Sequence, residues 1–142
     1  MAGYFTKLNG HVYEGEHKAG EELANGVFAT ITANGVKKLT AAGDAEFRVD
    51  EKTTLWGLPA IRMTCVYEGT KELFLVENEF EDYGDKELDW AAYTVPTGHY
   101  VKMRKPEAGD QLIISVTSEV AATLAVGDLC KPASGGSVAK KA

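Results

Sequence analysis

The chain is predicted to fold as an all-β protein, a small antiparallel barrel or sandwich of short strands with at most one or two short helices. Three observations predict this fold class. Short apolar runs rich in β-branched residues, such as QLIISVT at 111–117, are typical of strands. Asn-Gly and Gly-Asp pairs separate these runs, and both kinds of pair favour tight reversals of the chain. No βαβ pattern occurs, so a parallel sheet is not expected.

The composition predicts a single globular domain. The 142 residues are 44% hydrophobic and 25% charged, which is ordinary for such a domain and enough to bury a core. A net charge of −6 with dispersed lysines argues against nucleic acid as a partner. No run approaches the ~18 apolar residues of a membrane span, so a membrane partner is not expected. The N-terminus lacks the layout of a signal peptide, which predicts a soluble, reducing compartment.

Residues 1–20 are predicted to form an extended N-terminal arm. Glycines alternate there with aromatic side chains, and neither a helical nor a strand period holds over the segment. A solvated tail gains little from such apolar side chains, so the arm is expected to lie against its own domain or a partner. The candidate partner-binding residues are Tyr4, Phe5, Leu8 and Tyr13.

Residues 21–132 are predicted to form the β domain, and its first half is divided by turn signals. Asn-Gly pairs at 25–26 and 34–35 bracket the strand VFATITA, with VKKLT as the returning strand. Gly-Asp at 43–44 repeats the turn signal and precedes a strand that begins EFRV. Pro59 cannot donate to a ladder, so we expect a loop over 56–60 followed by a strand, AIRMTCVY.

The middle of the chain contains one buried strand and one acidic window. KELFLVENEF at 71–80 has apolar residues on both faces, which predicts a strand buried on both sides at its centre. The window at 79–90 is rich in Asp and Glu and is expected to be a solvated loop or short helix. A cation site is the alternative there, although the spacing does not follow the Ca²⁺-loop pattern.

The last part of the chain is predicted to alternate strands and turns. HYVKMRK at 99–105 alternates apolar and basic residues, as a half-buried strand does. Gly-Asp pairs at 109–110 and 127–128 are expected to form tight turns, and the Ala-rich stretch Glu119–Leu124 to form a helical turn. Residues 133–142 are small, polar and basic, so we expect a flexible C-terminal tail.

The two cysteines, Cys65 and Cys130, are expected to be buried, reduced thiols. Each stands alone, with no CxxC motif and no histidine at ligand spacing, although both lie in strand-like runs. The sequence alone leaves open whether the two cysteines lie close enough in space to pair.

The sequence contains no recognised catalytic or metal-binding motif, so we expect a protein that is not an enzyme and binds no cofactor or metal. The three histidines form no HxH or HExxH motif, and GxSxG, GxGxxG and GxxxxGK[ST] are absent. Glu77 and Glu79 have the spacing of a carboxylate pair, but a solvated strand face is the simpler interpretation. An enzyme of unrecognised type stays a minor alternative.

About a third of the chain carries a family resemblance. The segments that carry it have the same layout of turn, strand, Gly-Asp and strand, and end in a Gly-Gly pair followed by a Lys-rich tail. They are PTGHYV at 96–101, EAGD at 107–110, LAVGDL at 124–129 and PASGG at 132–136. This layout resembles the capsid decoration, cement or head-fibre-type structural proteins of tailed bacteriophages.

The resemblance implies a non-enzymatic virion protein on the outer capsid surface, made in the host cytoplasm. Such a protein would bind the major capsid protein where its subunits meet and stabilise the shell, commonly as a dimer or trimer. The segment 1–20 would then be the arm that lies over a neighbouring subunit, adding a strand to an exposed sheet edge.

A carbohydrate- or cell-surface-binding β-module of a phage tail or cell wall is the alternative function. It would require a platform of exposed aromatic side chains. The candidates are Trp56, Trp90, Tyr83 and Tyr93. Core packing is the favoured interpretation for all four, because Trp and Tyr side chains are mostly buried on average.

Overall fold

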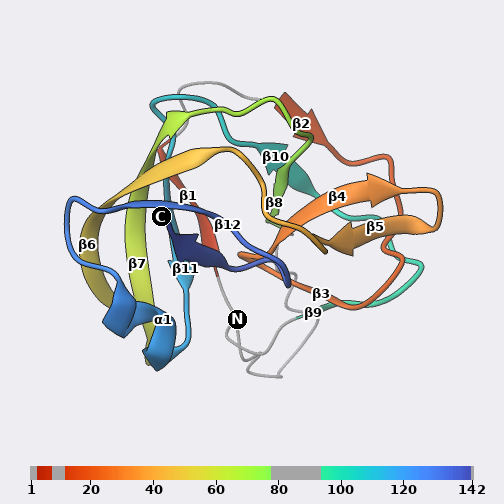
Figure 1. Ribbon diagram of the computed structural model, residues 1–142. Helices are drawn as coiled ribbons and strands as arrows, with labels where there is room; N and C mark the ends of the chain where they lie inside the picture. Colours follow the sequence, from red (N-terminus) through yellow and green to blue (C-terminus); the bar gives the residue numbers. More distant parts are fainter. Residues whose placement is uncertain (1–2, 8–11, 78–93, 142) are drawn as a thin grey trace.

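The predicted fold class is confirmed: the protein is a β-sandwich, and its two large sheets do not close into a barrel (Figure 1). The computed structural model describes residues 3–7, 12–77 and 94–141, which contain thirteen strands and one helix. All of the strand pairs are antiparallel.

Three sheets account for these strands. The six-stranded sheet contains, in spatial order, β1 (Gly3–Lys7), β11 (Gln111–Ser115), β7 (Leu58–Tyr67), β6 (Glu46–Leu55), β12 (Leu129–Pro132) and β13 (Val138–Lys140). The five-stranded sheet contains β2 (Val12–Glu14), β10 (Met103–Lys105), β8 (Phe74–Val76), β4 (Phe28–Thr32) and β5 (Gly35–Lys38). A third, two-stranded sheet pairs β3 (Leu23–Ala24) with β9 (Thr94–Val95), and the helix α1 spans Ser118–Thr123.

The main core lies between the two large sheets. Phe28 of β4 and Phe47 of β6 meet there with ring centroids 5.4 Å apart, so this pair joins the two sheets. Leu75 of β8 faces the same core, whereas Phe74 and Val76 face a second apolar cluster beneath the β3–β9 sheet. The prediction that this strand is buried on both sides is therefore confirmed.

The two C-terminal Gly-Asp pairs form the same turn twice, as predicted. In each, the Asp carboxylate accepts from the N–H three residues earlier, and the Asp N–H donates back to that residue's carbonyl. Gly109 and Gly127, at φ 95° and 93°, donate to the carbonyls of Cys65 in β7 and Val49 in β6. Each turn thereby holds one end of a neighbouring strand of the six-stranded sheet.

The third Gly-Asp pair acts differently. The carboxylate of Asp44 accepts from the N–H and hydroxyl of Thr70, at 2.8 and 2.7 Å, and from the N–H of Lys71 at 3.0 Å. These hydrogen bonds hold the pKa of Asp44 well below its usual range. Asp44 therefore connects two turns that are far apart in the sequence, and does not close a turn of its own.

The N-terminal segment belongs to the domain and is not a separate arm. Strand β1 is an edge of the six-stranded sheet and pairs with β11 from Gly3↔Ile114 to Lys7↔Gln111. Gly3 packs so closely on Gly26 that a Cβ would lie 2.7 Å from its Cα. Strand β2 continues the same segment as an edge of the five-stranded sheet. Of the two positions left open for the arm over residues 1–20, the described residues take the one against their own domain, because their main chain completes both sheets.

The predicted flexible tail is also corrected. Strand β13 pairs with β12 and buries Val138, and a turn at 133–136 precedes it. Gly136, at φ 87°, accepts from the N–H of Phe28, and a Cβ on it would lie 2.5 Å from Val27 Cγ1. The close approach explains why a run of small residues is ordered: only a residue without a side chain fits against β4 here.

The loop expected over 56–60 is a two-residue hairpin turn instead. Leu55 pairs with Leu58, which leaves Trp56 and Gly57 as the loop between β6 and β7. Pro59 lies inside β7, and the N–H of Val116 donates to its carbonyl at 2.8 Å. Val116 lies opposite Pro59 just after the end of β11, so the missing N–H of Pro59 costs one hydrogen bond at the last pair of this ladder, where a proline is tolerated.

Other local predictions are confirmed or fall outside the described residues. The hairpin of β4 and β5 reverses at Ala33-Asn34, one residue before the predicted Asn-Gly pair, and α1 covers most of the expected helical turn. The N–H of Val120 donates to the hydroxyl of Thr117, which caps the helix. The acidic window at 79–90 lies wholly in the undescribed segment 78–93, so its predicted loop stays a prediction.

Candidate binding surface

The face of the six-stranded sheet that points away from the core is the candidate binding surface, here called the outer face. Strand register places one row of residues across it, from β1 through β11 and β7 to β6. The row is Tyr4, Ile113, Arg62 and Glu51. Side chains alternate along each strand, so Phe5 and Leu112 point to the core instead.

An aromatic pair, here called the aromatic tip, lies at one end of the outer face. It consists of Tyr4 of β1 and Trp56 of the β6–β7 hairpin, with ring centroids 6.0 Å apart. Both side chains reach solvent, at 37% and 48% exposure. The expectation that Trp56 packs in the core is wrong, because a two-residue turn carries its side chain beyond the last pair of the hairpin.

Trp56 adopts a backbone conformation that is costly for a bulky residue. Its φ of 48° makes it the one non-glycine residue at positive φ among those described. With Gly57 at φ 82°, it forms a turn of the type I′ class, in which Asn-Gly is the preferred pair. A left-handed conformation costs an ordinary residue about 1–2 kcal/mol. An exposed tryptophan is therefore kept at a position where asparagine would be less strained.

Beneath the aromatic tip is a small apolar base. Leu55, Ala60 and Ile113 form a separate buried cluster on the outer face, and Ile113 is the register neighbour of Tyr4. The aromatic tip is thus seated on a rigid apolar support formed by β6, β7 and β11.

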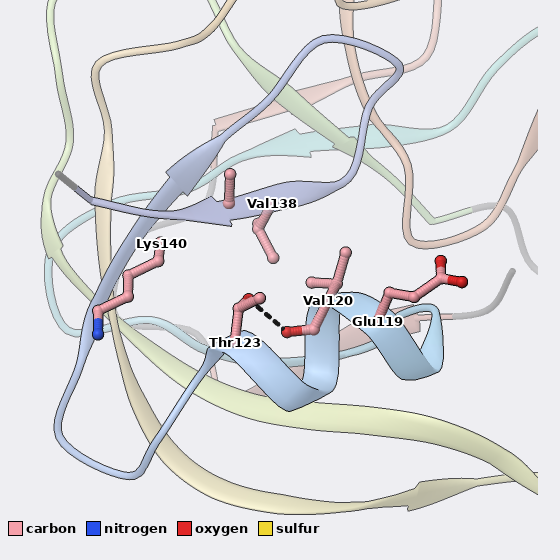
Figure 2. Close-up of a pocket in the computed structure, with 6 residues that line it drawn as sticks. Glu119, Val120, Thr123, Val138 and Lys140 are labelled. Carbon is pink, nitrogen blue, oxygen red and sulfur yellow. Dashed lines mark hydrogen bonds between the residues drawn. The ribbon is translucent and has the colours of Figure 1, made fainter.

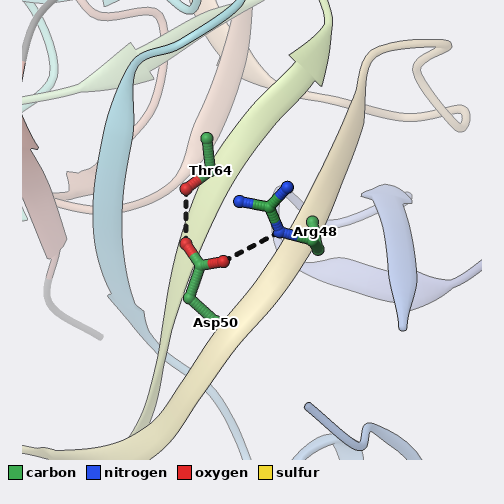
Figure 3. Close-up of polar contacts among 3 residues, drawn as sticks. All are labelled: Arg48, Asp50 and Thr64. Carbon is green, nitrogen blue, oxygen red and sulfur yellow. Dashed lines mark hydrogen bonds and ion pairs between the residues drawn. The ribbon is translucent and has the colours of Figure 1, made fainter. Parts of the chain in front are cut away.

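Beside the apolar base, the outer face is charged. Asp50 lies at a register shift between Val49 and Glu51, and its carboxylate accepts from Arg48 Nε at 3.0 Å and from the hydroxyl of Thr64 (Figure 3). Arg62 and Glu51 form a second ion pair, with Nε and Oε2 3.6 Å apart. The Arg62–Glu51 pair is solvent-exposed, so it contributes little to stability, and it places polar groups in the register row of Tyr4.

The predicted contact residues are divided between the two faces of the sheet. Tyr4 lies on the outer face, and Phe5 packs against the core. Leu8 lies outside the described residues, and Tyr13 is placed only by its main chain, which pairs with Arg104 in β10. The sequence therefore located one residue of the aromatic tip and missed Trp56. The signal for Trp56 was its Gly neighbour between two apolar strands.

Within the described residues, the side chains do not assemble a metal site. No group of three or more His, Cys, Asp or Glu residues is placed to hold a metal ion in that part of the chain. The described helix is also not long enough to cross a membrane.

The two cysteines are buried free thiols, as predicted. Both are register neighbours of Phe47, from opposite sides of β6, so two strand spacings, about 9.6 Å, separate them. That distance exceeds the ~7 Å limit for a disulfide. Burial raises the pKa of Cys65 to about 11 and that of Cys130 to about 12.

Comparisons with known proteins give no relative: no family model, curated protein or solved structure matches the chain.

Proposed function

We propose that the protein is a non-enzymatic virion structural protein that binds the outer surface of an icosahedral phage head where major capsid subunits meet, and stabilises the shell. The observation that carries the proposal is the aromatic tip, an exposed Trp–Tyr pair on a rigid apolar base. The resemblance of the segments at 96–136 to capsid decoration proteins supplies the identity of the partner.

Tyr4 and Trp56 have the properties of an interface centre. Tyrosine, tryptophan and arginine dominate the binding energy of protein interfaces, and the two aromatic side chains lose little side-chain entropy when covered. The exposed Arg62 lies in the same register row as Tyr4, at the position of a polar rim. Because strain in a backbone is kept where function requires it, the left-handed Trp56 favours a role in binding.

The pairing of the edge strands suits a protein that must withstand mechanical force. Both terminal strands are paired into the same six-stranded sheet, β1 at one edge and β13 at the other. A force applied through β1 or β13 therefore acts on the hydrogen bonds of this sheet. Several copies on one shell, or an assembled dimer or trimer, would convert modest single contacts into firm attachment.

The test is co-sedimentation with phage heads that lack this protein. Heads assembled from the major capsid protein encoded near this gene should retain the wild-type chain. Trp56→Ala and Tyr4→Ala should lower retention at least about tenfold, as expected for truncated hot-spot residues. Tyr100→Ala is the matched control, since Tyr100 is 58% exposed and its ring lies beneath Lys18, away from the outer face. Equal loss in the control, or full retention by both tip variants, would contradict the proposal.

Binding of a polysaccharide is the second candidate, because an exposed tryptophan beside a tyrosine can also stack on a sugar ring. Trp90, Tyr83 and Tyr93, the other residues of that platform, lie outside the described residues. Titration of tryptophan fluorescence with host-cell polysaccharide separates the two functions. A saturating change that disappears in Trp56→Ala, without binding to heads, would favour the carbohydrate function.

A further inference from the structure

Among the described residues, no strand pairs with the outer edge of the C-terminal strand β13 in the six-stranded sheet. The N–H of Ala133 donates to Ser137, and the N–H of Lys141 donates to Leu129, each at 2.9 Å. In an antiparallel ladder the residues that exchange hydrogen bonds alternate, so Ala139 also faces β12. The main-chain groups of Val138 and Lys140 therefore point away from β12, on the side where the sheet has no further strand.

Two other edge strands are closed. At β1, the outward N–H of Phe5 donates to the Glu77 carboxylate at 2.8 Å. At β5, residues 18–20 cover the edge, since the N–H of Val36 donates to Lys18 and the N–H of Gly20 donates to Val36. Closing sheet edges in this way is how proteins prevent unwanted strand pairing. The edge of β13 thus differs from the edges of β1 and β5, whose outward main-chain groups have hydrogen-bond partners.

A groove runs beside this open edge, between β13 and α1 (Figure 2). One part has a volume of about 390 Å³ and is lined by Glu119, Val120, Thr123, Val138, Ala139 and Lys140. A second part of about 400 Å³ shares Val120 and reaches Ser137, Val116 and Pro59. The groove therefore follows β13 along its whole length and has an apolar centre formed by Val120 and Val138.

The two ends of the groove carry opposite charges. Lys140 lies at one end, with its Nζ 3.4 Å from Asp128 and its side chain 55% exposed. Glu119 lies at the other end, on the first turn of α1 (Figure 2). An extended segment presents every second side chain to the same side, about 7 Å apart. Such a segment would meet a cation, an apolar centre and an anion in turn.

We propose that this groove binds an extended segment of a partner protein, which adds to β13 as a seventh strand. The segment runs antiparallel to β13, like every neighbouring pair in the sheet, and has the order acidic, any, apolar, any, basic. Its acidic side chain faces Lys140, its apolar side chain contacts Val120 and Val138, and its basic side chain faces Glu119. This surface is separate from the aromatic tip and does not depend on the function proposed above.

A second copy of the chain is not the occupant that the charges favour. In antiparallel pairing of β13 with β13 of another copy, Val138 and Lys140 would fill the apolar and basic positions of this order, but Gly136 would stand where the acidic residue is required. Lysines on an edge strand are a common device against such self-pairing. A foreign segment that carries an acidic residue fills all three positions.

The test uses two synthetic peptides and nuclear magnetic resonance of the full chain. One heptapeptide has threonine at odd positions and aspartate, valine and lysine, in that order, at positions 2, 4 and 6. The other exchanges the aspartate and the lysine. The first peptide should bind more tightly, and it should slow hydrogen exchange at the amides of Val138 and Lys140 while leaving the already paired Ala139 unchanged.

Two variants of one residue separate the main-chain contact from the charge. Lys140→Pro removes an outward N–H without removing a hydrogen bond to β12, whereas Lys140→Ser retains this N–H. The affinity for the first peptide should therefore be at least about fivefold lower in Lys140→Pro than in Lys140→Ser. Lys140→Ser should abolish the preference between the two peptides. Equal binding of both peptides to the wild type, preference for the exchanged peptide, or unchanged exchange at Val138 would overturn the proposal. Concentration-dependent dimerisation with the same protected amides would assign the edge to a second copy instead.

Discussion

At the scale of single residues, Trp56 connects the sequence to the proposed function. Its side chain has about half of its surface in solvent, and its main chain has a left-handed conformation that few bulky residues adopt. A core tryptophan would have neither property. Composition alone placed Trp56 in the core, since tryptophan is buried on average, and only the hairpin register corrected this.

Trp56→Asn tests whether this residue serves binding or folding. Asparagine accepts the left-handed conformation, so relief of strain offsets the loss of the Tyr4 contact. We expect the free energy of unfolding in urea to change by less than about 1 kcal/mol, while head binding is lost. A loss of stability above about 2 kcal/mol would instead make Trp56 a structural residue.

The buried thiol of Cys65 predicts a pH dependence of stability. Its pKa is about 11 in the folded protein and 9.0 in its ordinary state, because burial disfavours the thiolate. The buried thiol therefore makes its full contribution to the free energy of unfolding below pH 9, and this contribution is lost as the pH rises towards 11. Cys65→Val should lose less stability than wild type between pH 8 and pH 10.5 in urea unfolding. Parallel losses in the two proteins would contradict this.

At the scale of elements, the turns were predictable and the terminal strands were not. Asn34-Gly35, Gly109-Asp110 and Gly127-Asp128 are local signals, because each turn depends on the conformations of adjacent residues. Strand β1 pairs with a strand more than 100 residues away in the chain. Strand β13 pairs with a strand only about 8 residues away, but its segment consists mostly of small residues that give no strand pattern. Their sequences alone resemble termini that are free in solution.

Gly136 gives the sharpest test of the C-terminal segment. A Cβ at Gly136 would lie 2.5 Å from Val27 Cγ1 and 2.9 Å from the Phe28 carbonyl, whereas Gly135 has open space around it. The two glycines have similar φ values, 87° and 90°. Gly136→Ala should therefore lower stability by about 2 kcal/mol more than Gly135→Ala. Equal effects in thermal unfolding would show that the segment is not packed against β4.

Strand β1 predicts the result of an N-terminal truncation. Deleting residues 2–7 would remove an edge strand and expose Leu112 and Ile114, which Phe5 helps to cover. We expect a loss of at least about 2 kcal/mol in urea unfolding, in contrast to Tyr4→Ala, which retains the strand. A truncated protein as stable as the full chain would restore the interpretation of this segment as a separate arm.

At the scale of the whole molecule, the sequence predicted the fold class and the arrangement of turns. It could not predict how the sheets pair, since register across β1, β11 and β7 joins segments far apart in the chain. The candidate site was predicted only in part for the same reason. Tyr4 and Trp56 are 52 residues apart, and nothing local in either segment indicates that they meet.

Electron cryomicroscopy of heads reconstituted with the full chain tests the central claim most directly. We expect the outer face of the six-stranded sheet to contact the capsid, with Trp56 and Tyr4 buried at the junction of major capsid subunits. Density that places the aromatic tip in solvent, with the five-stranded sheet against the shell, would contradict it.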